Sequence, residues 1–325
     1  MIVKPLDVPL ILLQTEALDK RLPQHHKMKE LVSNDARRLR AGYNGEKSLD
    51  STLSLLDNST YYILHNLRIP DTNGFFQIDN LILTKSLCVL IEVKNIFGTV
   101  TFDEMGQMIR SHNDIEEGFR SPIEQIVKQE YRFKRWLKAN KFPTIPIEKL
   151  VVFSNSSTII RNMTSNRYFG NLVIHEDKLF SRLTQLEERY QESTLSIRQI
   201  KRVIKKLLEQ HASQLVDILE KYTISYNDLI KGVFCEHCKE IMNRDHGKWK
   251  CGICGWVSNE VYLNALKDYS ILIKRDINNR EARDFLNVNS YDVVKKLLKQ
   301  GGFEKIGTTS DTRYKLNFDK KPKMN

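Results

Sequence analysis

The amino-acid sequence predicts a mixed α/β protein, in which helices flank a central sheet and two smaller modules follow. Three observations predict this class. Apolar residues recur at helical and at strand-like spacing, in alternating segments, between residues 11 and 222. Two CxxC pairs lie close together between residues 235 and 254. The remaining segment has the pattern of helix, turn, helix and hairpin, so the 325 residues should form several domains.

The N-terminal two thirds of the chain hold the expected sheet and its helices. Helices are expected over residues 11–40, 46–56, 122–140 and 176–222. Strands are expected over residues 61–67, 75–83, 87–94, 99–102, 150–153 and 172–174. Residues 41–45, which include two glycines, should break the first helix. Because only residues 84–86 join the second and third strands, these strands should form an antiparallel hairpin.

Composition and charge predict a globular protein with a polyanionic partner. Hydrophobic residues make up 41% of the chain and charged residues 28%, which argues against wholesale disorder. The formal net charge is +11. Residues 233–325 hold 18 Lys and Arg against 12 Asp and Glu, and residues 1–232 hold 33 against 28, so their net charges are +6 and +5. The basic excess is therefore concentrated near the C-terminus, where it favours contact with nucleic acid.

The N-terminal residues and the cysteines predict a cytoplasmic protein. Residues 1–13 contain one lysine, a short apolar patch and no small-residue cleavage site, so they do not resemble a signal peptide. No stretch approaches the roughly 18 apolar residues of a membrane span, so no membrane partner is expected. Four of the five cysteines are clustered, which favours metal ligands over disulfides.

Three charged residues are unusual for the strands that contain them. Asp79 lies within an apolar strand, and Glu92 and Lys94 lie two positions apart in the next strand. Side chains two apart in a strand point to the same face, and hairpin pairing can bring Asp79 beside them. Two half-buried carboxylates repel each other and are costly to desolvate, and a divalent cation removes both problems.

This set of side chains suits hydrolysis of a phosphodiester. Carboxylate oxygens favour Mg²⁺ or Mn²⁺, which keep several waters and meet phosphate oxygens. Lys94 could orient or deprotonate a water or stabilise charge on the phosphate. The alternative is a surface salt bridge across the hairpin, but the apolar run before Glu92 indicates a buried strand and favours the hydrolytic site.

Several motifs around these residues resemble the nuclease-related domain, NERD, of the PD-(D/E)xK nuclease superfamily. The motifs are Gly42-Tyr43-Asn44-Gly45-Glu46, Phe76-Gln77-Ile78-Asp79, Ile91-Glu92-Val93-Lys94-Asn95 followed by Gly98, Ser121-Pro122 with Gln125, and Val151-Val152-Phe153-Ser154-Asn155. They occur in the order of the family over residues 37–180. The sequence departs from the family where Ser121 stands in place of the usual Asn.

The resemblance implies a PD-(D/E)xK-like mixed sheet and a role for each motif residue. Asp79 and Glu92 would ligate the metal, and Lys94 would be the catalytic lysine. Glu46 would be an accessory acid near the metal, and Gln125 would help to position phosphate or water. The alternatives for the last two are a glutamate favoured by the helix dipole and a solvated glutamine.

The cysteine quartet predicts a zinc ribbon. Its two CxxC pairs, separated by 12 residues, are Cys235 with Cys238 and Cys251 with Cys254. Four thiolates complete a closed tetrahedron around Zn²⁺, so this zinc should be structural and not catalytic. His237 and His246 lie within the unit but are not needed as ligands. Gly252 and Gly255 would permit the tight second turn, and Trp249 and Trp256 would shield the site.

The C-terminal segment predicts a winged helix-turn-helix. Helices are expected over residues 261–274, 278–286 and 291–299, and a hairpin over residues 303–306 and 312–316 with its turn at 308–311. The last helix would enter the major groove of DNA. The residues expected to contact nucleic acid are Ser290, Tyr291, Lys295, Lys296, Lys299 and Arg313. The alternatives are a helical cap with a solvated basic face and a protein-docking module.

These features together predict a metal-dependent nuclease, with DNA as the expected substrate. The expected segments are a helical extension (1–36), the nuclease-like domain (37–190), a helical linker (191–232), the zinc ribbon (233–257) and the winged-helix-like module (258–325). The competing hypotheses are a non-catalytic DNA-binding or repair accessory protein on the same scaffold, and an RNA-processing nuclease, since a metal-activated water does not need a 2′-hydroxyl.

Overall fold

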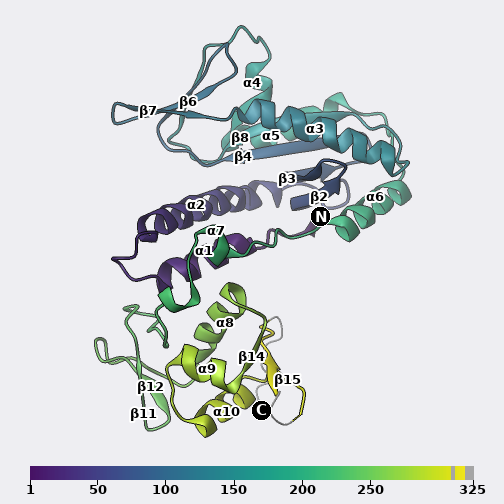
Figure 1. The fold of residues 1–325 in the computed structure, drawn as a ribbon. Helices are drawn as coiled ribbons and strands as arrows, with labels where there is room; N and C mark the ends of the chain where they lie inside the picture. The colour runs from purple at the N-terminus through teal and green to yellow at the C-terminus, as the bar shows by residue number, and fades with distance from the viewer. Residues whose placement is uncertain (309–311, 319–325) are drawn as a thin grey trace. The chain divides into compact units, whose positions relative to one another are not determined.

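The computed structural model describes residues 1–308 and 312–318 of the chain. They form two compact units, each built from separate stretches of sequence (Figure 1). The first unit comprises Met1–Pro9 and Arg38–Gln214, and the second comprises Leu10–Arg37 and Leu215–Asn325. Residues far apart in the sequence therefore share a core in each unit.

A six-stranded mixed sheet lies at the centre of the first unit, in the order β1-β2-β3-β4-β8-β10. Its strands are β1 (Ile2–Lys4), β2 (Tyr62–Asp71), β3 (Gly74–Leu83), β4 (Cys88–Lys94), β8 (Ile147–Phe153) and β10 (Val173–His175). The neighbours β2, β3 and β4 pair antiparallel, and the other neighbours pair in parallel. The predicted hairpin is therefore confirmed, and β4 lies buried between β3 and β8.

A second, four-stranded sheet begins a few residues after β4 and has the order β7-β6-β5-β9. Its strands are β5 (Thr99–Phe102), β6 (Met108–His112), β7 (Ile115–Phe119) and β9 (Ile159–Asn162). Of these, only β5 is predicted from the sequence. The other three are short, and most of their residues are partly or fully exposed, so they lack the apolar alternation that marks a strand.

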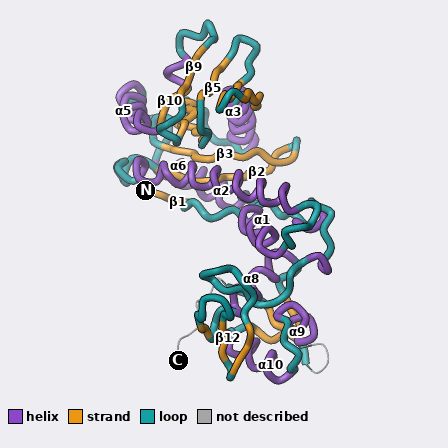
Figure 2. Tube along the Cα trace, turned by 90° about the vertical axis from the view of Figure 1, so that its left-hand side faces the viewer, coloured by secondary structure: helices purple, strands orange, loops and turns teal. Residues whose placement is uncertain are grey.

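Helices cover both faces of the six-stranded sheet. They are α2 (Lys29–Leu53), α3 (Pro122–Ala139), α4 (Phe169–Leu172), α5 (Leu179–Arg189) and α6 (Ile197–Gln210), with the 3-10 turn η1 (Glu176–Lys178). One face packs against α2 and α5 through a cluster that includes Leu49 and Ile91. The other packs against α3 and α6 through Leu90, Phe133 and Val203. Figure 2 shows α2 running beside β2 and β3.

The predicted helix break at residues 41–45 is wrong, because α2 runs through them without interruption. Gly45 does not end the helix but allows it to pack closely against the sheet. A Cβ atom at this position would lie 2.5 Å from Asn95 Cβ and 2.8 Å from Ser154 Oγ. The Asn95 amide also donates to the Ala41 carbonyl over 2.8 Å. The glycine therefore lets the helix approach the ends of β4 and β8.

We expect Gly45→Ala to destabilise the first unit by about 1–3 kcal/mol, because the overlap with Asn95 outweighs the higher helix propensity of alanine. Gly42→Ala is the matched control, since no atom lies within 4 Å of a Cβ built there. It should be neutral or stabilise by up to about 1 kcal/mol. Chemical denaturation of both variants measures the difference, and equal stability of the two would contradict this role of Gly45.

The predicted continuous helix over residues 176–222 is also wrong. The structure contains η1, α5 and α6 and the short α7 (Ile218–Lys221), with non-helical segments at 190–196 and 211–217. Ser196 caps α6 through a capping box with Gln199. A new helix therefore begins after Ser196, at Ile197, although the apolar spacing alone suggests continuity.

The second unit combines a four-cysteine segment with a helical module. Its elements are α1 (Leu10–Arg21), η2 (Tyr226–Asp228), β11 (Asn243–Asp245), β12 (Lys248–Lys250), β13 (Val257–Ser258), α8 (Tyr262–Leu272), β14 (Asp276–Asn278), α9 (Asn279–Leu286), α10 (Tyr291–Gln300), β15 (Glu304–Ile306) and β16 (Arg313–Lys315), together with α7 and the start of α2. The strands form two antiparallel sheets, β11-β12-β13 and β14-β16-β15. The strand β14 is not among the sequence predictions, whereas the hairpin of β15 and β16 is confirmed; residues 309–311 of its predicted turn lie outside the described residues.

Helix α1 is anchored in this unit by a buried ion pair. Arg21 is fully buried, and its guanidinium donates to Asp268 on α8 over 2.9 Å and to the Ile230 carbonyl over 3.0 Å. The same guanidinium lies 4.4 Å from the centre of the Phe285 ring. A buried charge needs partners such as these, so α1 belongs to the core of the second unit.

The compact units therefore divide the chain differently from the segments expected from the sequence. The expected extension 1–36 is shared between the units, and the expected linker 191–232 contributes α6 to the first unit and α7 to the second. The segments 233–257 and 258–325 share one hydrophobic cluster, which includes Trp249 and Leu266. No helix among residues 1–308 and 312–318 is long and apolar enough to cross a membrane.

Candidate active site and four-cysteine cluster

The structure brings Asp79 and Glu92 together at the end of the β3–β4 ladder. The last paired residues of the ladder are Asn80 and Ile91, so Asp79 and Glu92 follow as neighbours on the opposite face. Both side chains are buried, with 8% of Asp79 and 2% of Glu92 exposed. The Val93 amide donates to Asp79 Oδ2 over 2.9 Å. That bond holds one oxygen of the Asp79 carboxylate in place.

Glu92 lies at the centre of a hydrogen-bonded group. Lys94 Nζ donates to Glu92 Oε1 over 2.6 Å, as expected for side chains two apart on one strand. Lys94 Nζ also donates to Gln125 Oε1 on α3 over 3.3 Å. Gln129, one turn further along α3, donates to Glu92 Oε2 over 2.8 Å. The sequence interpretation missed Gln129, although its spacing of four from Gln125 places both on one helix face.

Glu46 on α2 and Lys4 on β1 add charge to this group. Burial and the charge of Glu92 raise the pKa of Glu46 to about 7, while Lys94 and Lys4 oppose that shift. Burial and the charges of Glu92 and Glu46 raise the pKa of Asp79 well above its usual range. Lys4 is buried, and burial lowers the pKa of its ammonium. Lys4 was not a predicted site residue, because only the parallel pairing of β1 with β2 brings it here.

The close approach of Glu46 to Glu92 and Asp79 predicts how the free energy of unfolding of the metal-free chain depends on pH. The pKa of Glu46 is higher in the folded state, so its protonated form favours folding, and that stability is lost as pH rises from about 4.5 to about 7. At a pH above 7 we therefore expect Glu46→Gln to be about 2–3 kcal/mol more stable, relative to low pH, than the wild-type chain. Glu188→Gln, at an exposed position, is the control. Thermal melts in chelator at pH 5 and pH 8 measure the change; an unaltered pH dependence in Glu46→Gln would count against the assigned environment.

The site fits a hard divalent cation. Two buried oxygens, Glu46 Oε2 and Gln129 Oε1, have no hydrogen-bond partner among the described residues. Carboxylate and amide oxygens are the ligand types that Mg²⁺ and Mn²⁺ favour. Among the described residues, however, only the four cysteines form a group of three or more His, Cys, Asp or Glu side chains with ligand atoms within 4.8 Å of one another. Asp79, Glu92 and Glu46 therefore lie near one another without forming so tight a group.

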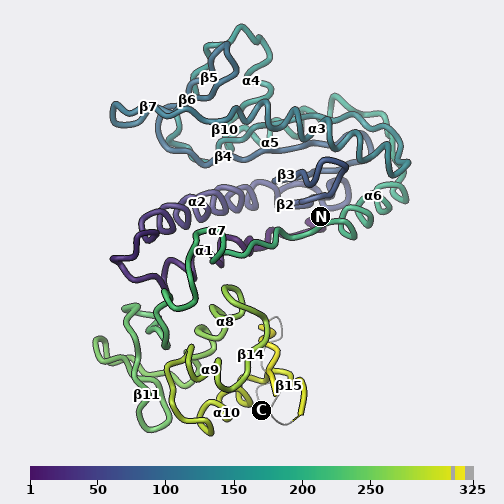
Figure 3. The backbone as a smooth tube through the Cα atoms, viewed as in Figure 1, coloured from purple at the N-terminus to yellow at the C-terminus, as the bar shows by residue number. Residues whose placement is uncertain are grey.

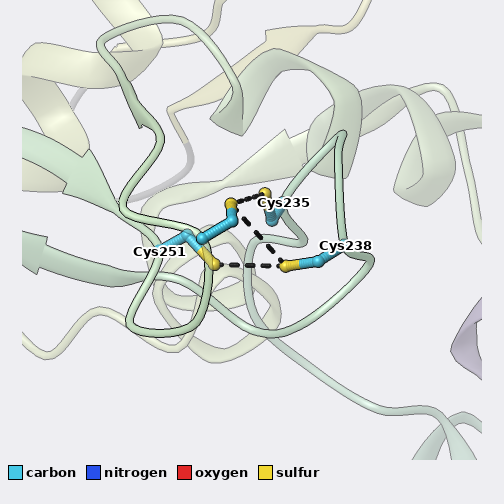
Figure 4. Close-up of side chains that lie close together, drawn as sticks. Cys235, Cys238 and Cys251 are labelled. Atoms are coloured by element: carbon cyan, nitrogen blue, oxygen red, sulfur yellow. Dashed lines mark hydrogen bonds between the residues drawn. The ribbon is translucent and has the colours of Figure 1, made fainter.

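The four cysteines converge on one point in the second unit (Figure 4). Sulfur–sulfur distances are 3.5 Å between Cys235 and Cys254, and 3.3 Å and 3.9 Å from Cys238 to Cys251 and to Cys254. A zinc tetrahedron with bonds of about 2.3 Å has sulfurs about 3.8 Å apart, whereas a disulfide needs about 2.05 Å. The cluster therefore fits a zinc ribbon and not a pair of disulfides.

Each cysteine pair lies in a tight turn of similar construction. The Lys239 amide donates to the Cys235 carbonyl, and the Gly255 amide donates to the Cys251 carbonyl. Both donors have a left-handed backbone, with φ of 65° at Lys239 and 73° at Gly255. Amides of Cys254 and Ile253 donate to the Cys251 sulfur and lower its pKa to about 6, which favours the thiolate that metals bind. Trp249 is buried beside the cluster, and Trp256 is half-buried.

Helix α10 presents most of the predicted nucleic-acid contacts on its outer face. Tyr291, Lys295, Lys296 and Lys299 are exposed. Ser290 caps the helix by accepting a hydrogen bond from the Val293 amide over 3.3 Å.

Arg313, the predicted contact from the wing, forms ion pairs within the module, and its contact with nucleic acid stays a prediction. Its guanidinium is bound by Asp276 at 2.7 Å and by Glu281 at 2.8 Å. These two carboxylates hold the guanidinium against β14 and α9, so its charge is already compensated within the module.

Comparison with known proteins agrees with the geometry of the first unit. A family model described as the nuclease-related domain matches residues 41–154. No curated protein matches the chain. The matched residues include Glu46, the hairpin that carries Asp79, Glu92 and Lys94, and the part of α3 that carries Gln125. The chain therefore carries a nuclease-related domain at residues 41–154, and the carboxylate and lysine site lies within it.

Proposed function

We propose that the first unit is a metal-dependent nuclease that hydrolyses phosphodiester bonds, with DNA as the expected substrate. One observation carries this proposal: Asp79, Glu92 and Lys94 meet at one end of the β3–β4 hairpin, and glutamines of α3 hold the last two. The match to the nuclease-related domain supports it. Loss of one core residue would favour a non-catalytic scaffold, and all three are present.

Each side chain has a distinct part in this proposal. Asp79 and Glu92 would hold Mg²⁺ or Mn²⁺, which when bound supplies Lewis-acid stabilisation of phosphate charge and a more acidic water. Lys94 places a positive charge beside the phosphate and can orient the attacking water. Gln125 positions Lys94, and Gln129 positions Glu92, so both are positioning residues. Glu46, with a pKa near 7, can accept a proton close to neutral pH.

We further propose that the second unit binds structural Zn²⁺ and directs the chain to nucleic acid. The order α8-β14-α9-α10-β15-β16, with β14 and β15 paired to β16, supports a winged helix. In such a module α10 enters the major groove. Its exposed lysines and Tyr291 are the contacts, and Arg313 has a structural part. The clustered cysteines favour a cytoplasmic location, which remains a prediction.

Cleavage by the purified full chain tests the proposal. Plasmid, linear duplex, single-stranded DNA and a matched RNA strand are incubated with Mg²⁺ or Mn²⁺, and Asp79→Ala is the control. The wild-type chain should cut at least one substrate in the presence of metal, and Asp79→Ala should not. If no substrate is cut above the level of Asp79→Ala, the enzyme proposal fails. The ratio of DNA to RNA cleavage decides the substrate class.

A further inference from the structure

An exposed row of side chains runs along α3, away from Lys94. Beginning with Gln125, residues at steps of three and four turn toward solvent: Lys128, Tyr131, Arg135 and Lys138. Tyr131 is 62% exposed, although it is aromatic. The thirteen helical steps from Gln125 to Lys138 extend about 20 Å. The row therefore begins at the candidate active site and continues well beyond it.

The lysines and the arginine of this row form no ion pair with a carboxylate of the described residues. Among the described residues, neither Lys128 nor Lys138 forms an ion pair within 4 Å. Arg135 donates to the Thr72 hydroxyl and lies over the Tyr131 ring, and its charge contributes weakly to the lowered pKa of Asp71, which Arg132 binds directly. The acidic Glu130 lies on a different face of α3 and is bound by Lys134 and Lys149. Glu124, beside Gln125, is the one exposed carboxylate of α3 near the row. These cations are therefore available to a polyanion.

The positive surface continues from α3 onto α6, and these two helices, which are far apart in the sequence, lie near each other at the right-hand end of the first unit in Figure 3. Trp136 Nε1 on α3 donates to Gln210 Oε1 on α6 over 2.6 Å. A shallow hollow there is lined by Asn140, Phe142, Arg202, Lys205, Lys206 and Glu209. Lys201 and Arg202 are exposed and form no ion pair with a described residue, whereas Lys205 lies 3.8 Å from Glu209.

We propose that this surface binds the single strand of nucleic acid that leads away from the scissile phosphate. We define it as the cationic stripe: Lys128, Tyr131, Arg135 and Lys138 of α3, with Lys201 and Arg202 of α6. The proposal rests on the proposed nuclease function for the position of the scissile phosphate. The cations neutralise backbone phosphates, and the exposed face of Tyr131 stacks on a base.

Tyr131 favours a single strand over a duplex as the occupant. In a duplex the bases are stacked inside and offer no face to a protein side chain that lies beside the backbone. In a single strand each base can stack on an aromatic ring, and cations beside the ring hold the adjoining phosphates. Arg135 lies 5.8 Å from the centre of the Tyr131 ring and can hold it in place.

Binding of the full chain to labelled oligothymidylate of about 16 nucleotides tests the stripe. Fluorescence anisotropy is measured in chelator, so the result does not depend on cleavage. Lys128→Gln with Lys138→Gln is compared with Lys85→Gln and Lys178→Gln, which remove the same charge from exposed positions outside the stripe. The comparison is repeated with Lys295, Lys296 and Lys299 changed to Gln, to remove binding by α10.

We expect the stripe variant to bind at least about fivefold more weakly, and the slope of log affinity against log salt to fall by about 1.4. The control variant should change affinity by less than about twofold. Tyr131→Ala should weaken binding at least about fivefold, and Tyr131→Phe should retain it. Equal effects of the two lysine variants, or no wild-type binding, would overturn the stripe.

Two further outcomes separate the parts of this inference. If Tyr131→Ala weakens binding of a duplex as much as binding of oligothymidylate, the assignment to a single strand is overturned. If the chain cuts nothing but the stripe variant still weakens binding, the nuclease proposal fails and the stripe stands. If the chain cuts nucleic acid but the stripe variant binds oligothymidylate as tightly as the wild type, the nuclease proposal stands and the stripe is overturned.

Discussion

Lys94→Ala is expected to lower the rate of phosphodiester cleavage by about 10²–10³-fold, the usual effect of removing one group that stabilises transition-state charge. The ammonium group bridges Glu92 and Gln125, so its position is fixed before substrate arrives. The substitution leaves Asp79 and Glu92 in place to hold metal. The loss should therefore appear in the rate of the chemical step and much less in the affinity for substrate.

Single-turnover cleavage with Mg²⁺, together with binding in chelator, measures these two quantities separately. Lys85→Ala, at an exposed position on the β3–β4 connection, is the control for loss of a lysine. A Lys94→Ala variant that cuts within about threefold of the wild-type rate would remove Lys94 from the catalytic set. A rate loss explained entirely by weaker binding would assign it to substrate affinity instead.

Loss of metal from the cysteine cluster is expected to unfold much of the second unit. Structural zinc sites contribute about 10–16 kcal/mol of apparent binding free energy, more than most domains have in total stability. Cys235, Cys251 and Trp249 belong to the same buried cluster as Phe285 and Leu297. The disorder that follows removal of the metal should therefore spread from the turns into α8, α9 and α10.

Cys251→Ser tests this expectation, because serine cannot supply the fourth thiolate. Metal content by mass spectrometry should fall from one zinc per chain to well below one, and helical circular dichroism should decrease. His237→Ala is the matched control: this exposed residue lies between two ligands, and its ring packs 4.9 Å from Trp256. A Cys251→Ser variant that keeps one zinc and the wild-type melting temperature would contradict the expectation, as would equal zinc loss from His237→Ala.

Local patterns in the sequence are sufficient for much of the fold and the site. Alternation of apolar residues and the three-residue connection predict the β3–β4 hairpin, and hairpin pairing carries Asp79 to Glu92. Spacing of two places Lys94 beside Glu92. The CxxC pairs predict the four-cysteine cluster, since a tight turn brings both sulfurs of a pair to one point. In each case the residues that contact each other are close in sequence or lie opposite each other in one β-hairpin.

Contacts between distant segments decide the rest. Gly45 reads as a helix breaker, yet it is required where α2 meets Asn95, and only that approach gives glycine its purpose. Lys4 reaches the site through parallel pairing of β1 with β2, and Arg21 enters the core of the second unit through Asp268.

The ion pairs of Arg313 are likewise visible only in the tertiary structure. The sequence predicts Arg313 only as a nucleic-acid contact in the wing, and the folded module adds its ion pairs with Asp276 and Glu281. Sequence by itself therefore determined which residues make up the candidate sites and which of their pairings are local. Tertiary structure alone decided which glutamine holds Glu92, which charges remain free and which helix belongs to which core, because burial and long-range pairing depend on how the whole chain packs.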